Sequence, residues 1–173
     1  MATFKSYDRK SAVQYAQKWA LSRNPDYQDY ENWGGDCTNY ISQCLHFGGI
    51  PFDHIGNNIL KQWYWYNNNN RTPSWTGAEP FYKYLITNNS QETQNFGIYA
   101  KETSYNDLQP GDIVQLLYED NLAYHNMIIT KVILNESYLI DYLICQHTYD
   151  LLNYPLSMKE GKKRYLKILG YYE

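Results

Sequence analysis

The stretch Trp33-Gly34-Gly35-Asp36-Cys37-Thr38-Asn39-Tyr40 dominates the interpretation of this chain, because it joins a tight turn to the start of a helix. Two glycines let the backbone turn sharply, and Asp36 is a residue type that favours a helix N-cap. Cys37 therefore falls in the first turn, where backbone N–H groups and the helix dipole stabilise a thiolate. We expect the Asp36 carboxylate to point into its own capping bonds, since it would oppose thiolate formation if it faced the sulfur.

The segments around this stretch predict three helices. The helix that begins at Cys37 is expected to end at Gly48-Gly49, with an apolar face formed by Tyr40, Ile41, Cys44 and Leu45. An amphipathic helix capped by Asp8 is predicted over about residues 8–22, and a shorter helix over residues 77–87. The Asn-rich residues 57–71 are expected to form a loop.

The second half of the chain changes to the period of strands. Residues 108–112, Leu-Gln-Pro-Gly-Asp, predict a turn. Strands are predicted over residues 113–118, 124–134, 137–147 and 166–172, and a short turn after residue 134 makes the middle two an antiparallel hairpin. Helices followed by an antiparallel sheet indicate an α+β fold, which we expect to be a single domain over residues 1–173.

Four histidines are available as a base for Cys37. His125 begins a predicted strand, and a base at a strand end that meets a cysteine at a helix start has the geometry that thiol activation needs. His46 and His54 fall at a helix end and in the following loop, where we expect surface or capping roles. The pair Cys37 and His125 is therefore the predicted catalytic pair.

The group that orients His125 depends on the hairpin register. A three-residue loop over residues 135–137 pairs His125 with His147 on one face of the sheet. A two-residue loop places Gln146 opposite His125 instead. The first register makes His147 the third catalytic residue, and Asp150 just beyond it is the alternative.

Composition and charge limit the classes of protein. The three cysteines are an odd number, and Cys37 and Cys44 lie about 10 Å apart along one helix, beyond the reach of a disulfide. We expect at least one free thiol, no metal and no cofactor; a zinc site of Cys37, His125 and His147 is weak because those residues are dispersed.

The net charge of −3 gives little support for nucleic-acid binding. The basic run at residues 162–164 is expected to be a solvated turn. No apolar run has the length of a membrane span, and the N-terminus lacks the apolar stretch of a signal peptide. The chain is therefore expected in the cytosol or as an excised extracytoplasmic domain, and its compartment and oligomeric state stay open.

These segments resemble the putative amidase domain family of bacterial papain-like proteins, which is related more distantly to NlpC/P60 and CHAP domains. The matching stretches are residues 7–9, 12–16, 24–27, 35–45, 48–51, 108–115, 125–130 and 147–150, in the order of the family. The resemblance implies a papain-like, NlpC/P60-like fold with N-terminal helices packed on an antiparallel sheet. It also implies Cys37 and His125 as the catalytic pair, His147 as the third residue, and a peptide or bacterial cell-wall peptide as substrate.

We therefore predict a cysteine-dependent hydrolase that cleaves peptide amide bonds through a Cys37 thioester. The main-chain N–H of Cys37 and an upstream donor are expected to hold the oxyanion. The predicted substrate-binding residues are Tyr30, Asn32, Asp36 and Asn39, although satisfying buried polar groups is the favoured role for Asn39.

Two other functions are compatible with the same residues. The chain is alternatively a binding module that recognises wall peptides or glycans without hydrolysis, or an enzyme that transfers the acyl group to an amine. Selective alkylation of Cys37 over Cys44 would favour the enzyme, because a thiol on the apolar helix face is usually inert.

Overall fold

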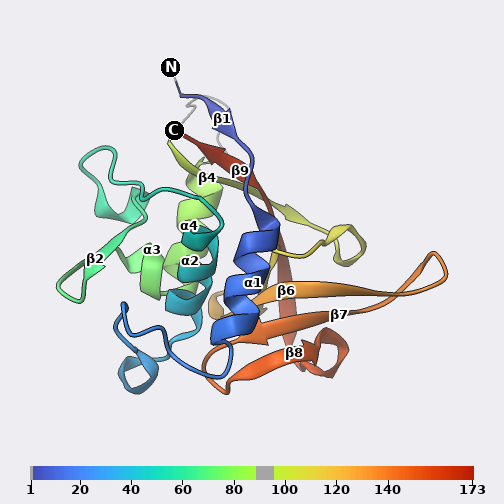
Figure 1. The fold of residues 1–173 in the computed structure, drawn as a ribbon. Coiled ribbons are helices and arrows are strands. Elements are labelled where there is room, and N and C mark those ends of the chain that lie inside the picture. Colours follow the sequence, from blue (N-terminus) through green and yellow to red (C-terminus); the bar gives the residue numbers. More distant parts are fainter. Residues whose placement is uncertain (1, 89–95) are drawn as a thin grey trace.

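The computed structural model describes residues 2–88 and 96–173, and it combines helices with an antiparallel sheet (Figure 1). The helices are α1 (Arg9–Trp19), α2 (Cys37–Phe47), α3 (Pro73–Thr76) and α4 (Ala78–Asn88). The strands are β1 (Phe4–Lys5), β2 (Trp65–Asn67), β3 (Asn70–Arg71), β4 (Gly97–Thr103), β5 (Ile113–Leu117), β6 (Ala123–Asn135), β7 (Tyr138–Gln146), β8 (Leu151–Pro155) and β9 (Lys162–Tyr172).

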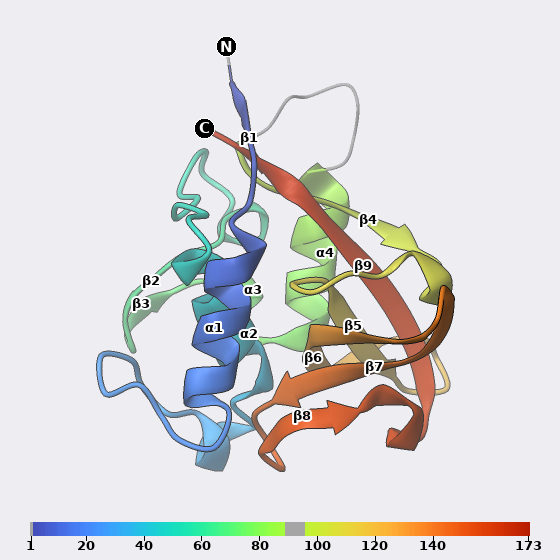
Figure 2. The same cartoon turned by 45° about the vertical axis from the view of Figure 1, so that its right-hand side comes forward.

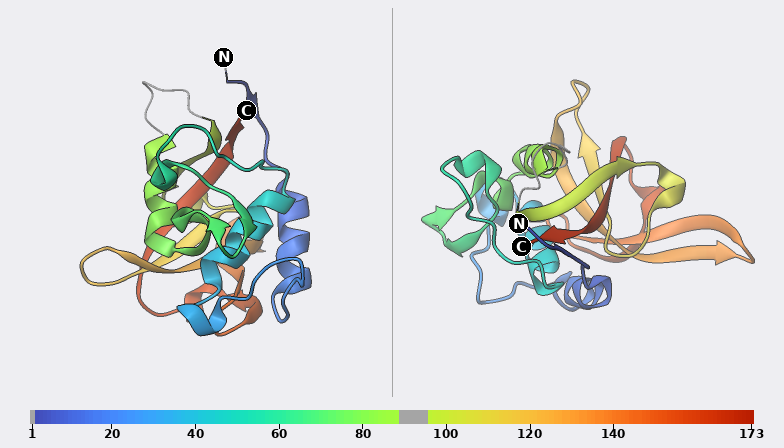
Figure 3. Two further views of the ribbon diagram at one scale, coloured as in Figure 1. Left: turned by 90° about the vertical axis from the view of Figure 1, so that its left-hand side faces the viewer. Right: turned by 90° about the horizontal axis from the view of Figure 1, so that it is seen from above.

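Seven strands form a curled antiparallel sheet in the order β1-β9-β5-β6-β7-β8, with β4 also paired to β9. Helices α1, α2 and α4 all contact β6 and cover one face of this sheet (Figure 2). The β6–β7 hairpin extends beyond the helices and projects from the body of the molecule (Figure 3). The predicted α+β arrangement, with N-terminal helices packed on an antiparallel sheet, is confirmed.

Helix α2 is the buried centre of the helical layer. Residues 37–45 are all buried, because α2 contacts α1, α3 and α4 as well as strands β6 and β7 of the sheet. The predicted apolar face of the helix packs into the main core with side chains of β5, β6 and β7 such as Ile113, Ile128 and Cys145. Such complete burial accounts for most of the helix's stability, since a fully buried Leu or Ile contributes about 1.5–3 kcal/mol.

The polar side of α2 is buried as well, and its groups are hydrogen-bonded. Ser42 Oγ donates to the Trp75 carbonyl and accepts from Trp63 Nε1. Gln43 Oε1 accepts from the Tyr15 hydroxyl at 2.7 Å. These contacts explain how polar residues tolerate a buried helix, because a buried polar group is costly only when it lacks a partner.

Several local predictions are confirmed and others are wrong. Asp8 caps α1 through the Ser11 N–H, as predicted. The Asn-rich segment contains the β2–β3 hairpin instead of a loop. The basic run at residues 162–164 opens β9 instead of forming a turn, because Arg164 stacks on the Tyr82 ring and donates to Gln115 Oε1. Strands β1, β4 and β8 were not predicted.

All three cysteines are free thiols and buried. In the described residues, none of the helices has the length and apolarity that crossing a membrane requires.

Candidate active site

Cys37 and His125 line the same cavity, which has a volume of about 480 Å³. The cavity lies between the N-terminal end of α2, the neighbouring strands β5 and β6, and the segment that leads from the end of β7 to residue 160. The structure thus brings together the two residues that the sequence predicts as the catalytic pair, although they are 88 positions apart in the chain.

Two glycines place Cys37 at this cavity. Gly34 and Gly35 both have φ of +108°, a conformation that other residues rarely adopt. A Cβ on Gly35 would also lie 3.1 Å from Thr148 Oγ1, so a larger residue there is crowded as well as strained. The tight turn that the sequence predicts before Cys37 is therefore confirmed.

The neighbours of Cys37 and His125 bind each other directly. Asn126 Nδ2 donates to Thr38 Oγ1 at 2.9 Å, which ties β6 to the first turn of α2. Gln115 Nε2 donates to Asn126 Oδ1 at 2.9 Å and holds the amide in this orientation. Because Asn126 follows His125 and Thr38 follows Cys37, this hydrogen bond fixes the strand of the base against the helix of the thiol.

The pKa of the Cys37 thiol lies above its ordinary value. Burial raises the pKa of Cys37, which is 7% exposed, and the Asp36 charge adds to this rise. The backbone N–H of Asn126 and the Thr38 hydroxyl and N–H lower the pKa but do not outweigh burial. The N–H groups near the helix start thus act in the expected direction, but burial is the larger effect because desolvation penalises the charged form.

The imidazole of His125 is neutral near pH 7. Burial, with a smaller contribution from the Lys159 ammonium, lowers the pKa of His125 to about 4, although the Gln146 side chain opposes this shift. A neutral imidazole retains a lone pair and can accept a proton. The cavity thus holds an uncharged thiol and an uncharged base.

The predicted pairing of His125 with His147 is wrong. The turn between β6 and β7 consists of Glu136 and Ser137, so that Asn135 pairs with Tyr138. Two register shifts follow along the strands, and the ladder ends at the pair Ile128↔Cys145. Neither predicted register has this turn, and β7 ends before His147 is reached.

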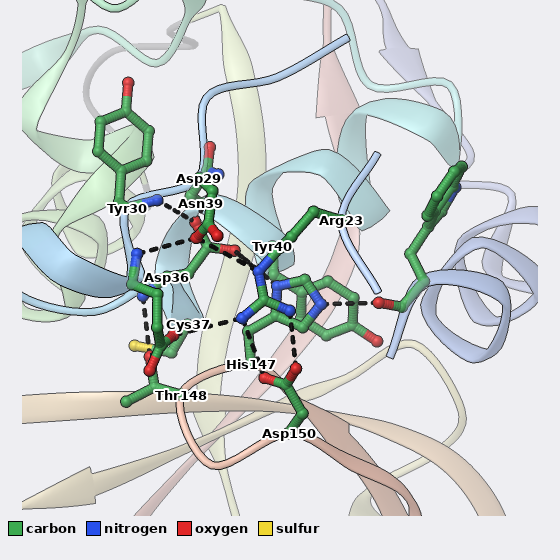
Figure 4. A network of polar contacts seen from close by, with 12 residues as sticks. Arg23, Asp29, Tyr30, Asp36, Cys37, Asn39, Tyr40, His147, Thr148 and Asp150 are labelled. Carbon is green, nitrogen blue, oxygen red and sulfur yellow. Dashed lines mark hydrogen bonds and ion pairs between the residues drawn. The ribbon is translucent and has the colours of Figure 1, made fainter. Parts of the chain in front are cut away.

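His147 instead contacts Asp36, Trp19 and Tyr40 (Figure 4). Its Nδ1 lies 2.6 Å from Asp36 Oδ2 and its Nε2 lies 2.7 Å from the Trp19 carbonyl oxygen. The ring stacks on Tyr40 with 4.0 Å between the centroids. His147 is therefore engaged by Asp36 and by the Trp19 carbonyl, and it does not orient His125.

Asp36 does not make the predicted capping bonds in its own helix. Its Oδ1 accepts from the Tyr30 N–H and from Asn39 Nδ2, both at 2.9 Å. Its Oδ2 faces His147 and, at 3.5 Å, Arg23 Nε. The carboxylate is thus directed at the buried His147, the partly exposed Arg23 and two N–H donors.

The alternative orienting group, Asp150, is also engaged elsewhere. Arg23 holds both of its carboxylate oxygens, at 2.8 and 3.1 Å, and contacts Glu31 Oε2 at 3.4 Å. Thr148 Oγ1 accepts from the Asp36 N–H and donates to Glu31. These contacts form one network that locks the turn before α2 to the loop after β7 (Figure 4).

Within the described chain, the cavity lining includes none of the four predicted substrate-binding residues. Tyr30 is buried and its hydroxyl accepts from Trp65 Nε1. Asn39 is buried, donates to the Gln28 carbonyl and accepts from Trp75 Nε1. Asn32 is exposed in a short 3-10 helix, Glu31–Trp33. Asp36 and Asn39 thus bind buried polar groups next to the cavity, which is the role that the sequence analysis favours for Asn39.

Gln146 is the residue that the alternative register, with a two-residue loop, placed opposite His125. It is fully buried, and its Nε2 donates to the carbonyls of Thr148 and Tyr149 at 3.0 and 2.8 Å. Among the described residues, neither its Oε1 nor His125 Nε2 has a hydrogen-bond partner. In the sequence, the only indication of a role for Gln146 was the alternative hairpin register, which places it opposite His125.

The family model of the putative amidase domain matches residues 6–169. The uncharacterized protein YhbB of Bacillus subtilis (strain 168) is 36% identical over 124 residues, covering 71% of this chain and 36% of YhbB. The uncharacterized protein YjcM of the same organism is 30% identical over 175 residues, covering 94% of this chain and 36% of YjcM. This chain thus spans about a third of the length of these relatives. No solved structure matches.

The matched region includes every residue of the cavity and of the network behind it. An amidase-type domain indicates a hydrolase that acts on amide bonds. The chain belongs to the putative amidase domain family.

Proposed function

We propose that the protein is a cysteine-dependent hydrolase that cleaves peptide amide bonds, with Cys37 as nucleophile and His125 as base. The observation that carries this proposal is the shared cavity, in which a thiol at a helix start and a neutral imidazole are held together by the Asn126–Thr38 hydrogen bond. Cys44 and Cys145 are fully buried in the core, and neither is among the described residues that line this cavity.

We assign the orienting role to Gln146. Its amide nitrogen is held by two carbonyls, which directs the oxygen to the side of His125. Buried polar atoms without a partner are rare and call for an explanation, and here a donor and an acceptor of this kind are neighbours. A small ring rotation lets His125 Nε2–H donate to Gln146 Oε1, which leaves the Nδ1 lone pair as the base.

The reaction starts from neutral groups. His125 Nδ1 takes the Cys37 proton as the sulfur attacks the amide carbonyl carbon, and the oxyanion is held by the free N–H groups of the first turn of α2. His125 then gives the proton to the departing amine, and a Cys37 thioester remains. Water attacks the thioester with His125 as base, and the carboxylic acid leaves as the thiol is restored.

The substrate class proposed is a peptide, with bacterial cell-wall peptides as the leading example. Apolar side chains of the cavity, such as Leu116, Leu151 and Tyr154, offer contact area for the side chains of a peptide. The family resemblance supports the same class.

The test is turnover of a panel of muropeptides and dipeptides by wild type, Cys37→Ala and Cys44→Ala. We expect Cys37→Ala to lose all turnover with an unchanged circular dichroism spectrum, and Cys44→Ala to retain it. A Cys37-linked acyl group detected by mass spectrometry after acid quenching would identify the thioester. Turnover that persists in Cys37→Ala would refute the proposal.

A second function, a binding module without hydrolysis, is favoured by the burial of Cys37 and its raised pKa. Iodoacetamide distinguishes the two near neutral pH, because a catalytic Cys37 is alkylated well before Cys44 and Cys145. Equal sluggishness of all three thiols, with binding of wall peptides equal in wild type and Cys37→Ala, would support the binding module.

A further inference from the structure

Among the described residues, one cation, Lys159, lines the cavity that contains Cys37 and His125. Lys159 follows the 3-10 helix Leu156–Met158 and is half-buried at the cavity wall. The ion pairs that described lysines form involve Lys5, Lys83 and Lys167 only. Lys159 therefore brings a positive charge to the cavity that no carboxylate of the described chain neutralises.

The charge of Lys159 acts on His125. Its ammonium contributes to the lowering of the His125 pKa, so its field reaches the imidazole. Burial and the neighbouring Lys163 lower the pKa of Lys159 itself, so its cationic form lacks compensating charge nearby. Lys163 Nζ donates to the carbonyls of Lys159 and Gly161, and Lys163 is not among the described residues that line the cavity.

The rest of the lining is almost free of charge. Glu160 is the only described carboxylate of the cavity, and it is exposed, so that water screens it more than the half-buried Lys159. The other lining side chains are neutral at pH 7, including His125. The N-terminal end of α2 at the opposite wall adds a partial positive charge. A negative group is thus the ligand that this cavity favours.

We propose that Lys159 forms a carboxylate-binding subsite, so that the enzyme acts on peptides that carry a free carboxylate close to the cleaved amide bond. The inference rests on the proposed function for the reaction, but the subsite itself depends only on the position of Lys159 in the wall of the cavity that Cys37 also lines. The carboxylate pairs with the Lys159 ammonium while the scissile carbonyl faces Cys37.

The subsite is tested with two thiol reagents that differ in charge, iodoacetate and iodoacetamide. The measured quantity is the ratio of their rate constants for alkylation of Cys37, divided by the same ratio for N-acetylcysteine. We expect this normalised ratio to exceed one in wild type and to fall about fivefold in Lys159→Met, which corresponds to a Coulomb energy of about 1 kcal/mol. An unchanged ratio in Lys159→Met would overturn the proposal.

Two further variants separate charge from loop perturbation. Lys159→Arg keeps the cation and should keep the wild-type ratio. Glu160→Gln removes the opposite charge from the adjacent position and should raise the ratio or leave it unchanged. A fall in Glu160→Gln equal to that in Lys159→Met would show that the loop matters and the ammonium does not, and would also overturn the proposal.

Hydrolysis supplies an independent arm. Peptides with a free carboxylate are compared with the same peptides as carboxamides, and we expect wild type to prefer the acid through a lower KM and Lys159→Met to lose that preference. Absence of all turnover would refute the proposed function while leaving the alkylation ratio to decide the subsite. Turnover with equal KM for acid and carboxamide in wild type would refute the subsite alone.

Discussion

Two histidines near the ends of neighbouring strands are buried to a similar degree and yet differ in every contact. His125 is 6% exposed and neutral, and its buried Nε2 has no hydrogen-bond partner in the part of the chain that the structure describes. His147 is 2% exposed, and both of its nitrogens are hydrogen-bonded within the network of Asp36 and Arg23. The difference shows that burial alone does not define a catalytic histidine. An unmet hydrogen-bonding capacity at a cavity points to chemistry, whereas complete pairing behind the nucleophile points to support.

The largest expected effect is on activity, from loss of the unpaired histidine. His125→Ala removes the base and should lower kcat/KM about a thousandfold, the range expected for general acid–base catalysis. His54→Ala, at an exposed loop position, serves as the control and should retain activity. Initial rates on the peptide substrate measure both. If His125→Ala kept a rate within tenfold of wild type, His125 would not be the base and the contrast between the two histidines would fail.

The paired histidine should matter for stability instead. His147→Phe retains a ring against Tyr40 but leaves the buried Asp36 carboxylate without its closest partner, and we expect the free energy of unfolding to fall by about 3 kcal/mol. Urea unfolding followed by tryptophan fluorescence measures the change. A smaller loss in the Asp36→Asn background would show that the two side chains are coupled. If His125→Ala were the more destabilising variant, the assignment of roles would be reversed.

The pH dependence of stability separates the histidines further. The pKa of His125 is about 4 in the folded protein and near 6.5 when unfolded. Between these values the unfolded state binds more protons, so stability is complete above pH 6.5 and falls as the pH decreases towards 4, by up to about 3 kcal/mol. Urea midpoints at pH 4.5 and 7 should therefore differ less in His125→Ala than in wild type, and an equal difference would contradict the neutral assignment.

The smallest expected effect concerns the orienting residue. Gln146→Met retains the shape of the side chain but removes the amide, so the His125 ring is held less well and kcat should fall about tenfold with little change in KM. Gln146→Glu offers the matched variant, because it supplies an acceptor oxygen at the same place and should recover part of the rate. Equal kcat for wild type and Gln146→Met would remove Gln146 from the mechanism.

The sequence predicts well whatever depends on local signals. The glycine turn, the start of α2 at Cys37 and the cap of α1 by Asp8 follow from backbone preferences within a few residues. Strands β5, β6, β7 and β9 follow from their apolar patterns. Strands β1, β4 and β8 escape prediction because they are short or lie at the edges of the sheet, where pairing with β9 or β7 makes the strand.

The sequence alone therefore determined that a cysteine opens a helix and that a histidine lies on a strand beside a hairpin. Only the tertiary structure decided which group each side chain meets. The hairpin turn lies one residue further along than predicted and the ladder ends before His147 is reached, and packing around the start of α2 buried Cys37 and raised its pKa. Register and desolvation arise from contacts between segments distant in the chain, so no local pattern can specify them.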